Sequence, residues 1–292
     1  MKSLTIITTT YNRSYCLDRL YDSLLEQSCK DFIWLIVDDG STDDTKDKVN
    51  EWAKEQKIVI EYYYKENGGM HTARNLAYEK VHTELNTIID SDDWMATDAV
   101  KKIISYWESN KDDKYAGMIT LNKDPVGKTI GSELPQGIVS CSYKDFWKKY
   151  HMTGDKKLVY RSELTRQFPY PEFNKEKFYP AATKFYMIDK KYDMLICDIT
   201  TCIVNYNDNS MTRDKFAQYK TCALSFMDYR KVMIDINLGF KENAKNMIHY
   251  VMEMSIAKVK PHPQMQKKPL FYLCYLPGKL LYFYIMNTQK KY

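Results

Sequence analysis

The sequence of 292 residues lacks several patterns that would place it in a common class of protein. Its seven cysteines are scattered and include no C-x-x-C pair, which argues for reduced thiols and against a disulfide framework or a zinc site. It contains neither G-x-G-x-x-G nor G-x-x-x-x-G-K-[ST], which disfavours a dinucleotide dehydrogenase and a P-loop NTPase. Ser3–Thr10 is too short and polar for a signal peptide and predicts a first strand instead.

The chain also lacks a large net charge of either sign. The net charge is +5, and the hydrophobic and charged fractions of 44% and 28% are ordinary for a soluble globular protein. A mildly basic chain is compatible with an anionic ligand or membrane surface, and we expect no nucleic-acid partner. The length indicates one large domain, or a domain with an appendage.

What the sequence does have is a regular alternation of strand and helix patterns over its first 120 residues. The expected strands are Leu4–Thr9, Phe32–Val37, Ile58–Tyr64, Leu85–Ile89 and Tyr115–Leu121. Such alternation predicts an α/β fold with a mostly parallel central sheet. Beyond it we expect a helix over Glu176–Lys190, a strand over Met194–Val204, and helices after Ser210.

This pattern predicts an α/β domain over residues 1–210 and a helical extension over residues 211–292. Within the first domain, the alternation is regular over residues 1–120 and weakens from Asn122.

Polar groups follow four of the expected elements at the point where each strand ends. They read TTTYNR at Thr8–Arg13, DDGST at Asp38–Thr42, NGGMHTARN at Asn67–Asn75, and DSDD at Asp90–Asp93. Ligands of open parallel sheets bind at the carboxyl ends of strands, so we expect these groups to meet in one site. Taken singly, DDGST and DSDD are equally compatible with turn and helix-entry residues.

The DSDD group gathers three carboxylates after a short apolar strand, and so requires nearby positive charge. Adjacent hard oxygen ligands suit Mg²⁺ or Mn²⁺, which accept few protein ligands and keep positions for phosphate oxygens. The sequence therefore predicts a divalent ion carrying a diphosphate among Asp90, Asp92 and Asp93.

Together, TIITTTYNR, IVDDGSTDDT, ENGGMHTARN and TIIDSDDW resemble the nucleotide-sugar-binding half of family 2 glycosyltransferases. The resemblance is close over residues 1–120 and looser to about residue 210. It implies that residues 1–120 form the nucleotide-sugar-binding half of the domain and residues 121–210 the acceptor half. It implies the GT-A fold and inverting transfer of a sugar from a nucleotide donor, usually a UDP-sugar, to an acceptor hydroxyl.

The resemblance also implies roles for single residues. Thr9, Tyr11 and Asp39 would hold the base, with the Asp39 carboxylate accepting from uracil N3–H, and Arg74 would lie near the diphosphate or the base. Asp90 would approach the ribose, and Asp92 would bind the metal with Asp93 assisting. The remaining expected donor-site residues are Arg13, Gly69, His71 and Ser91. His71 could orient a phosphate, and it is equally compatible with a helix-start residue that bonds to the backbone.

Inverting transfer needs a general base, which in the resembling family is an acidic residue at the start of a helix in the second half. Glu176 is the first candidate here and Asp155 the second, and both are also compatible with surface carboxylates. The family carries an acid after the proline of this segment, where this chain has Ala181.

The last segment, residues 267–292, is aromatic and basic. Its apolar run is interrupted by Pro277 and Gly278, so it is a poor candidate for a spanning helix. Aromatic and aliphatic groups bordered by lysines are typical of a segment in the membrane interface, and a helix docked on its own domain is equally compatible.

The sequence thus predicts a glycosyltransferase acting on a glycan or lipid-linked acceptor in surface polysaccharide biosynthesis. We expect it in the cytoplasm or on the inner face of the membrane. Two alternatives remain: a metal-dependent nucleotidyltransferase, and a glycosyltransferase-like binding module without a base.

Overall fold

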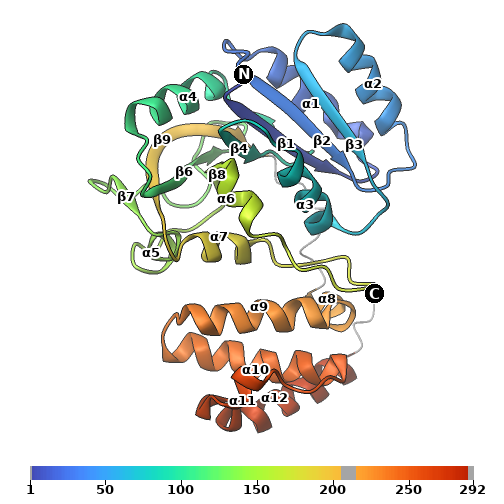
Figure 1. The fold of residues 1–292 in the computed structure, drawn as a ribbon, viewed down its shortest axis with the longest axis vertical. Coiled ribbons are helices and arrows are strands. Elements are labelled where there is room, and N and C mark those ends of the chain that lie inside the picture. The colour runs from blue at the N-terminus through green and yellow to red at the C-terminus, as the bar shows by residue number, and fades with distance from the viewer. Residues whose placement is uncertain (1, 205–214, 289–292) are drawn as a thin grey trace. The chain divides into compact units, whose positions relative to one another are not determined.

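A computed structural model describes residues 2–204 and 215–288 of the chain (Figure 1). The chain forms two compact units, which are described separately below. The first contains residues 1–169 and 184–207, and the second contains residues 170–183 and 208–292. The expected boundary between residues 210 and 211 lies outside the described residues and stays a prediction.

The first unit is built on a nine-stranded sheet in the order β3-β2-β1-β4-β8-β6-β9-β5, with β7 paired to β9. Its strands are β1 (Leu4–Thr10), β2 (Phe32–Asp38), β3 (Val59–Tyr64), β4 (Leu85–Ile88), β5 (Trp94–Met95), β6 (Tyr115–Lys123), β7 (Ser140–Cys141), β8 (Lys156–Arg161) and β9 (Asp193–Ile203). Its helices are α1 (Ser14–Leu25), α2 (Thr45–Glu55), α3 (Met70–Lys80), α4 (Ala99–Asn110), α5 (Tyr143–Lys148), α6 (Ser162–Gln167) and α7 (Ala182–Ile188).

Strands β1 to β4 form the parallel half of this sheet. β1 pairs in parallel with β2 and β4, and β2 with β3, so that all four carboxyl ends meet at one edge. All seven residues of β2 are buried, as expected of an interior parallel strand covered on both faces. On one face Trp34 stacks with Tyr21 and Trp52. The expected α/β fold is therefore confirmed.

The other half of the sheet contains antiparallel strands that the sequence did not indicate. β8 pairs antiparallel with both β4 and β6, while β6 and β9 are parallel. Short β5 and β7 each pair antiparallel with β9.

The second unit combines the mostly irregular residues 170–183 with a helical part over residues 215–288. Its helices are α8 (Lys215–Thr221), α9 (Ala223–Ile236), α10 (Phe240–Ala257), α11 (Pro263–Gln266) and α12 (Pro269–Asn287). Figure 1 shows α9, α10 and α12 side by side, and their core includes Met247, Tyr250, Val251 and Phe271. Helix α12 runs through Pro277 without a break. No helix of the described ranges is both long and apolar enough to cross a bilayer.

Candidate active site

The four polar groups expected to meet do follow the carboxyl ends of neighbouring strands. In the sheet Thr9 lies beside Val37, Asp38 beside Tyr64, and Ile7 beside Ile88. Because these strands are parallel and in register, the loops after β1, β2, β3 and β4 lie at the same edge (Figure 1).

The turn after β2 is held by two buried aspartates. Asp38 accepts hydrogen bonds from Ser41 N at 2.7 Å and from Tyr62 Oη at 2.6 Å. Burial, together with the Asp38 carboxylate, raises the pKa of Tyr62, which keeps the phenol protonated as the donor.

Asp39 connects this turn to the loop after β3. Asp39 is only 4% exposed. Its carboxylate accepts hydrogen bonds from Lys65 Nζ at 2.8 Å, Gly68 N at 3.0 Å and Gly69 N at 2.7 Å. Gly69 precedes α3 with φ of 94°, a conformation that other residues rarely adopt. Asp39 therefore fixes the start of α3, which carries His71 and Arg74.

Each aspartate of DSDD faces its own basic side chain. Arg74 lies 3.4 Å from Asp90, Arg13 lies 2.8 Å from Asp92, and Lys157 lies 3.8 Å from Asp93. The positive charge required by three neighbouring carboxylates is thus supplied by three different elements of the fold.

These surroundings shift the pKa values of the cluster in different directions. Burial acts to raise the pKa of Asp90, but the charges of Lys157, Arg74 and Arg13 outweigh it and hold the pKa below its usual range. For Asp93, burial dominates over Lys157 and raises the pKa to about 7. Burial opposes the charge on Lys157, but the anionic groups around it raise its pKa above the usual value.

Two of these carboxylates are accessible to a ligand. The side chains of Asp92 and Asp90 are 38% and 47% exposed, whereas that of Asp93 is 8% exposed. No group of three or more His, Cys, Asp or Glu side chains within residues 2–204 and 215–288 is arranged around a common metal position. The site therefore fits a cation that takes one or two carboxylate oxygens and fills its other positions with water or phosphate.

Of the remaining expected donor-site residues, Arg13 and Ser91 lie at this cluster. Arg13 also donates to Ser91 Oγ at 3.4 Å. Tyr11 is 49% exposed at the end of β1, and His71 is 2% exposed. The structure thus brings Arg13, Ser91 and Asp92 together, and Arg74 with Asp90, while the roles of all these residues stay predictions.

The two candidates for the general base lie in different surroundings. Asp155 is exposed, accepts from Asn122 Nδ2 at 2.8 Å, and contributes to the raised pKa of Asp93. Glu176 belongs to the helical unit, where its two carboxylate oxygens accept from Leu224 N at 2.8 Å and Ser225 N at 2.7 Å. Glu176 thereby caps the first turn of α9.

The expectation that a helix begins at Glu176 is wrong. The helix α7 begins at Ala182, after an irregular segment that includes Pro169, Pro171 and Pro180. A residue that precedes proline is disfavoured in helical conformation, which explains the later start.

Sequence reasoning missed two lysines of the site, Lys65 and Lys157. Lys65 follows β3 directly, so its position at a strand end was a usable signal. Lys157 lies in β8, and the β-branched and aromatic character of KKLVYR was the only indication of that strand.

Solved structures with this fold include glycosyltransferases. A crystal structure of Staphylococcus aureus TarS 1–349 in complex with UDP-GlcNAc aligns with a TM-score of 0.60 and 17% identity, covering 97% of this chain and 90% of that one. The mannosyltransferase PcManGT of Pyrobaculum calidifontis, in complex with GDP-Man and Mn²⁺, aligns with a TM-score of 0.56 and 17% identity, covering 99% and 88%. The α/β unit therefore has the GT-A fold.

Residues 5–168 match the family model described as Glycosyl transferase family 2. The match covers more than half of the 292 residues, and the chain belongs to this family.

Relatives of different lengths share this region. The chain is 27% identical to the Bacillus subtilis glycosyltransferase TuaG, named for teichuronic acid biosynthesis, over 255 residues that cover 84% of this chain and 96% of TuaG. It is 38% identical to the teichoic acid poly(glycerol phosphate) polymerase of Staphylococcus epidermidis over 101 residues, which are 34% of this chain and only 14% of that protein. The Escherichia coli relative WfgD, named as a UDP-Glc:α-D-GlcNAc-diphosphoundecaprenol β-1,3-glucosyltransferase, is 24% identical over 262 residues, covering 89% and 94%.

Proposed function

We propose that this protein is an inverting glycosyltransferase of surface polysaccharide biosynthesis that uses a UDP-sugar donor. The acceptor is a hydroxyl of a glycan or of a lipid-linked saccharide. The observation that carries this proposal is the single strand-end site, in which Asp39 and the DSDD group follow strands of the parallel half and Arg74 of α3 contacts Asp90. The names of TuaG and WfgD, and the UDP-GlcNAc bound to TarS, support the same substrate class.

Within the donor site, Asp39 accepts from uracil N3–H while Thr9 and Tyr11 contact the base. The Asp39 carboxylate accepts from Lys65 Nζ, Asn67 Nδ2, Gly68 N and Gly69 N, which use its about four lone-pair positions. Uracil N3–H therefore replaces one of the two side-chain donors when the base binds. Asp90, which pairs with Arg74, contacts the ribose. Arg13, His71 and Arg74 face the diphosphate, for which a guanidinium offers a planar set of donors.

The metal ligand in this proposal is Asp92, assisted by Asp93. A bound Mn²⁺ or Mg²⁺ would stabilise the departing nucleoside diphosphate as a Lewis acid. Arg13 pairs with Asp92 in the structure, so donor binding redistributes this guanidinium between the carboxylate and the phosphate oxygens.

Of the two base candidates, Asp155 now has the stronger support. It lies in the same unit as DSDD and is exposed, whereas both oxygens of Glu176 are engaged by the backbone of α9. We therefore propose that Asp155 takes the proton from the acceptor hydroxyl.

The principal alternative is a nucleotide-sugar-binding module that lacks a base. It is favoured by Ala181, which stands where the resembling family carries an acid, and by the capping role of Glu176. A nucleotidyltransferase would instead consume a nucleoside triphosphate and release pyrophosphate.

The donor site can be tested by titration calorimetry with UDP, with and without Mn²⁺. Asp92→Ala should abolish the metal-dependent part of the affinity, and Asp39→Ala should weaken UDP binding even without metal. Asp44→Ala is a matched control, because this exposed aspartate lies in the same loop outside the proposed site. Wild-type affinity in both site variants would refute the donor assignment.

We also propose that the helical unit contacts an anionic membrane surface on the cytoplasmic side. Eight large apolar residues of α12 are exposed: Tyr272, Leu273, Tyr275, Leu276, Leu280, Phe283, Tyr284 and Met286. Such a face, next to lysines, is suited to the interfacial region of a bilayer. Lys290 and Lys291 of the predicted segment 267–292 lie outside the described residues.

A further inference from the structure

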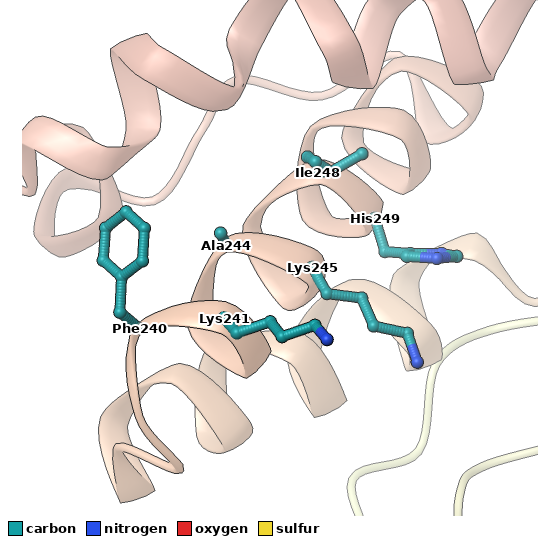
Figure 2. Close-up of a pocket in the computed structure, with 6 residues that line it drawn as sticks. All are labelled: Phe240, Lys241, Ala244, Lys245, Ile248 and His249. Atoms are coloured by element: carbon teal, nitrogen blue, oxygen red, sulfur yellow. The ribbon is translucent and has the colours of Figure 1, made fainter.

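A groove along α10 combines apolar and basic side chains in two regular rows. Phe240, Ala244 and Ile248 form one row, and Lys241, Lys245 and His249 form the other (Figure 2). Both rows have a spacing of four residues, which places their members one above another on a helix. The groove has a volume of about 490 Å³.

The two lysines of the polar row are available for a ligand, and His249 is half-buried beside them. No ion pair of Lys241 or Lys245 occurs among the residues that the structure describes, and both lysines are exposed. His249 Nδ1 is buried and has no hydrogen-bond partner within the described ranges. Burial lowers the pKa of His249 to about 4, with smaller contributions from the charges of Arg230 and Lys245. Its imidazole is therefore neutral at pH 7. A neutral imidazole can donate one hydrogen bond to an anionic oxygen.

The apolar row lies against the helix that carries the exposed apolar face. Cys274 Sγ of α12 lies 3.7 Å from the Ala244 carbonyl oxygen, and Gly278 approaches the Ile248 carbonyl. Phe240, at the open end of this row, is 76% exposed. The groove therefore adjoins the surface that we propose to contact a membrane.

The charge of this region also favours an anion. Residues 240–288 contain seven lysines and two glutamates. One of the glutamates, Glu253, is fully buried beside Arg230 and contributes little to the surface.

We propose that the α10 groove binds the phosphate headgroup of a membrane glycerophospholipid. The phosphate oxygens contact Lys241, Lys245 and His249, and the first methylenes of the acyl chains cover Phe240, Ala244 and Ile248. Inorganic phosphate alone would leave the apolar row uncovered, so the groove selects an amphiphile. This inference rests on the membrane contact proposed above and adds a headgroup-selective site to it.

The site can be tested without a bilayer by calorimetry with dihexanoyl phosphatidic acid below its micelle concentration. Lys241→Gln/Lys245→Gln should weaken binding about 10- to 30-fold, as expected for the loss of two lysines near a phosphate. Ala244→Phe fills the apolar row without a change of charge and should weaken binding as well. Lys258→Gln/Lys260→Gln removes the same charge elsewhere and should bind as wild type does. Circular dichroism checks that each variant is folded.

Vesicle sedimentation separates this inference from the proposal on which it rests. Wild type should prefer vesicles containing phosphatidic acid over pure phosphatidylcholine, and the Lys241/Lys245 variant should lose that preference. Replacing Leu273, Leu276 and Leu280 of α12 by Gln should reduce binding to both kinds of vesicle. Equal weakening by the two lysine pairs, or binding of inorganic phosphate as tight as that of the lipid, would overturn the groove assignment. Absence of vesicle binding together with intact binding of the short lipid would refute only the membrane contact.

Discussion

Single residues in this protein carry charge in very different surroundings. The Arg13–Asp92 pair has side chains that are 28% and 38% exposed, and such pairs contribute at most about 1 kcal/mol to stability. The Lys157–Asp93 pair is almost fully buried, at 8% for each side chain. Removing one member of a buried pair leaves an uncompensated charge, which is far more costly. Lys157 is therefore a structural requirement of the DSDD group, whereas Arg13 is free to exchange its partner.

The roles of Asp155 and Glu176 can be separated by measuring transfer and stability together. Asp155→Asn should lower transfer by about 10²–10⁴-fold, as expected for the loss of a general base, and leave the unfolding midpoint nearly unchanged. Glu176→Gln should lower stability by about 1 kcal/mol, because it weakens the cap of α9. Glu133→Gln is a control at an exposed glutamate. A large loss of transfer in Glu176→Gln with unchanged stability would return the base to Glu176.

Glu253 should give the helical unit a distinct pH dependence. Burial raises the pKa of Glu253 from 4.5 to about 8, against the opposing charge of Arg230. The native state thus holds this proton more tightly than the unfolded state does. The stabilisation from this bound proton is complete below pH 4.5 and is lost as the pH rises toward about 8. Over this range the free energy of unfolding falls by no more than about 1.4 kcal/mol per pH unit.

Urea denaturation at several pH values would measure this effect. Glu253→Gln cannot titrate, so its stability should decline less than that of wild type between about pH 5 and pH 8. Parallel pH profiles for the two proteins would show that Glu253 does not titrate in this range.

At the scale of elements, α12 is kept against α10 by close backbone approach. A Cβ added at Gly278 would lie 2.6 Å from Val251 Cβ and 2.8 Å from the Ile248 carbonyl oxygen. Both atoms belong to the α10 scaffold and cannot move aside as the end of a flexible side chain could. Gly278 is thus needed for packing, although glycine and the preceding Pro277 both disfavour a helix.

Gly278→Ala is therefore expected to destabilise the helical unit. The forced separation should cost about 1–3 kcal/mol, which exceeds the gain of about 1 kcal/mol in helix propensity. Leu280→Ala, at a residue that is 62% exposed on the same helix, should change stability little. Thermal unfolding of both variants measures the difference, and a stabilised Gly278→Ala would show that the helices separate without cost.

For the molecule as a whole, the two units are not consecutive in sequence. Residues 170–183 leave the α/β unit, contribute to the helical unit, and are followed by residues 184–207 of the first unit. In the helical unit Tyr179 Oη donates to Asp228 Oδ2 at 2.9 Å, and Phe178 stacks on Phe226 at 5.4 Å. The helical unit therefore includes residues 170–183, which come before its helices in the sequence and pack against α9.

A fragment that ends at residue 207 should for this reason fold imperfectly. It retains Phe178 and Tyr179 but loses Asp228 and Phe226, so apolar surface becomes exposed. We expect faster limited proteolysis within residues 170–183 and more binding of a hydrophobic dye than in the full chain. Phe178→Ser in the fragment should reduce dye binding. A fragment as protected as the full chain would show that this segment needs no partner from the helical unit.

The sequence by itself determined the α/β class, the first four strands to within about one residue, and the groups at their carboxyl ends. This was possible because hydrophobic periodicity and strand-end motifs are local properties of the chain. Asp39 and the DSDD group could be located in this way.

Only the tertiary structure decided which charges face one another. Lys157 reaches Asp93 from a strand 64 positions further along the chain, and Glu176 reaches α9 across 48 positions. No local pattern records such pairings, because they depend on which segments the sheet order and the helix packing bring together. The same holds for Pro277, whose local preference to interrupt a helix is overcome by the packing of α12 on α10.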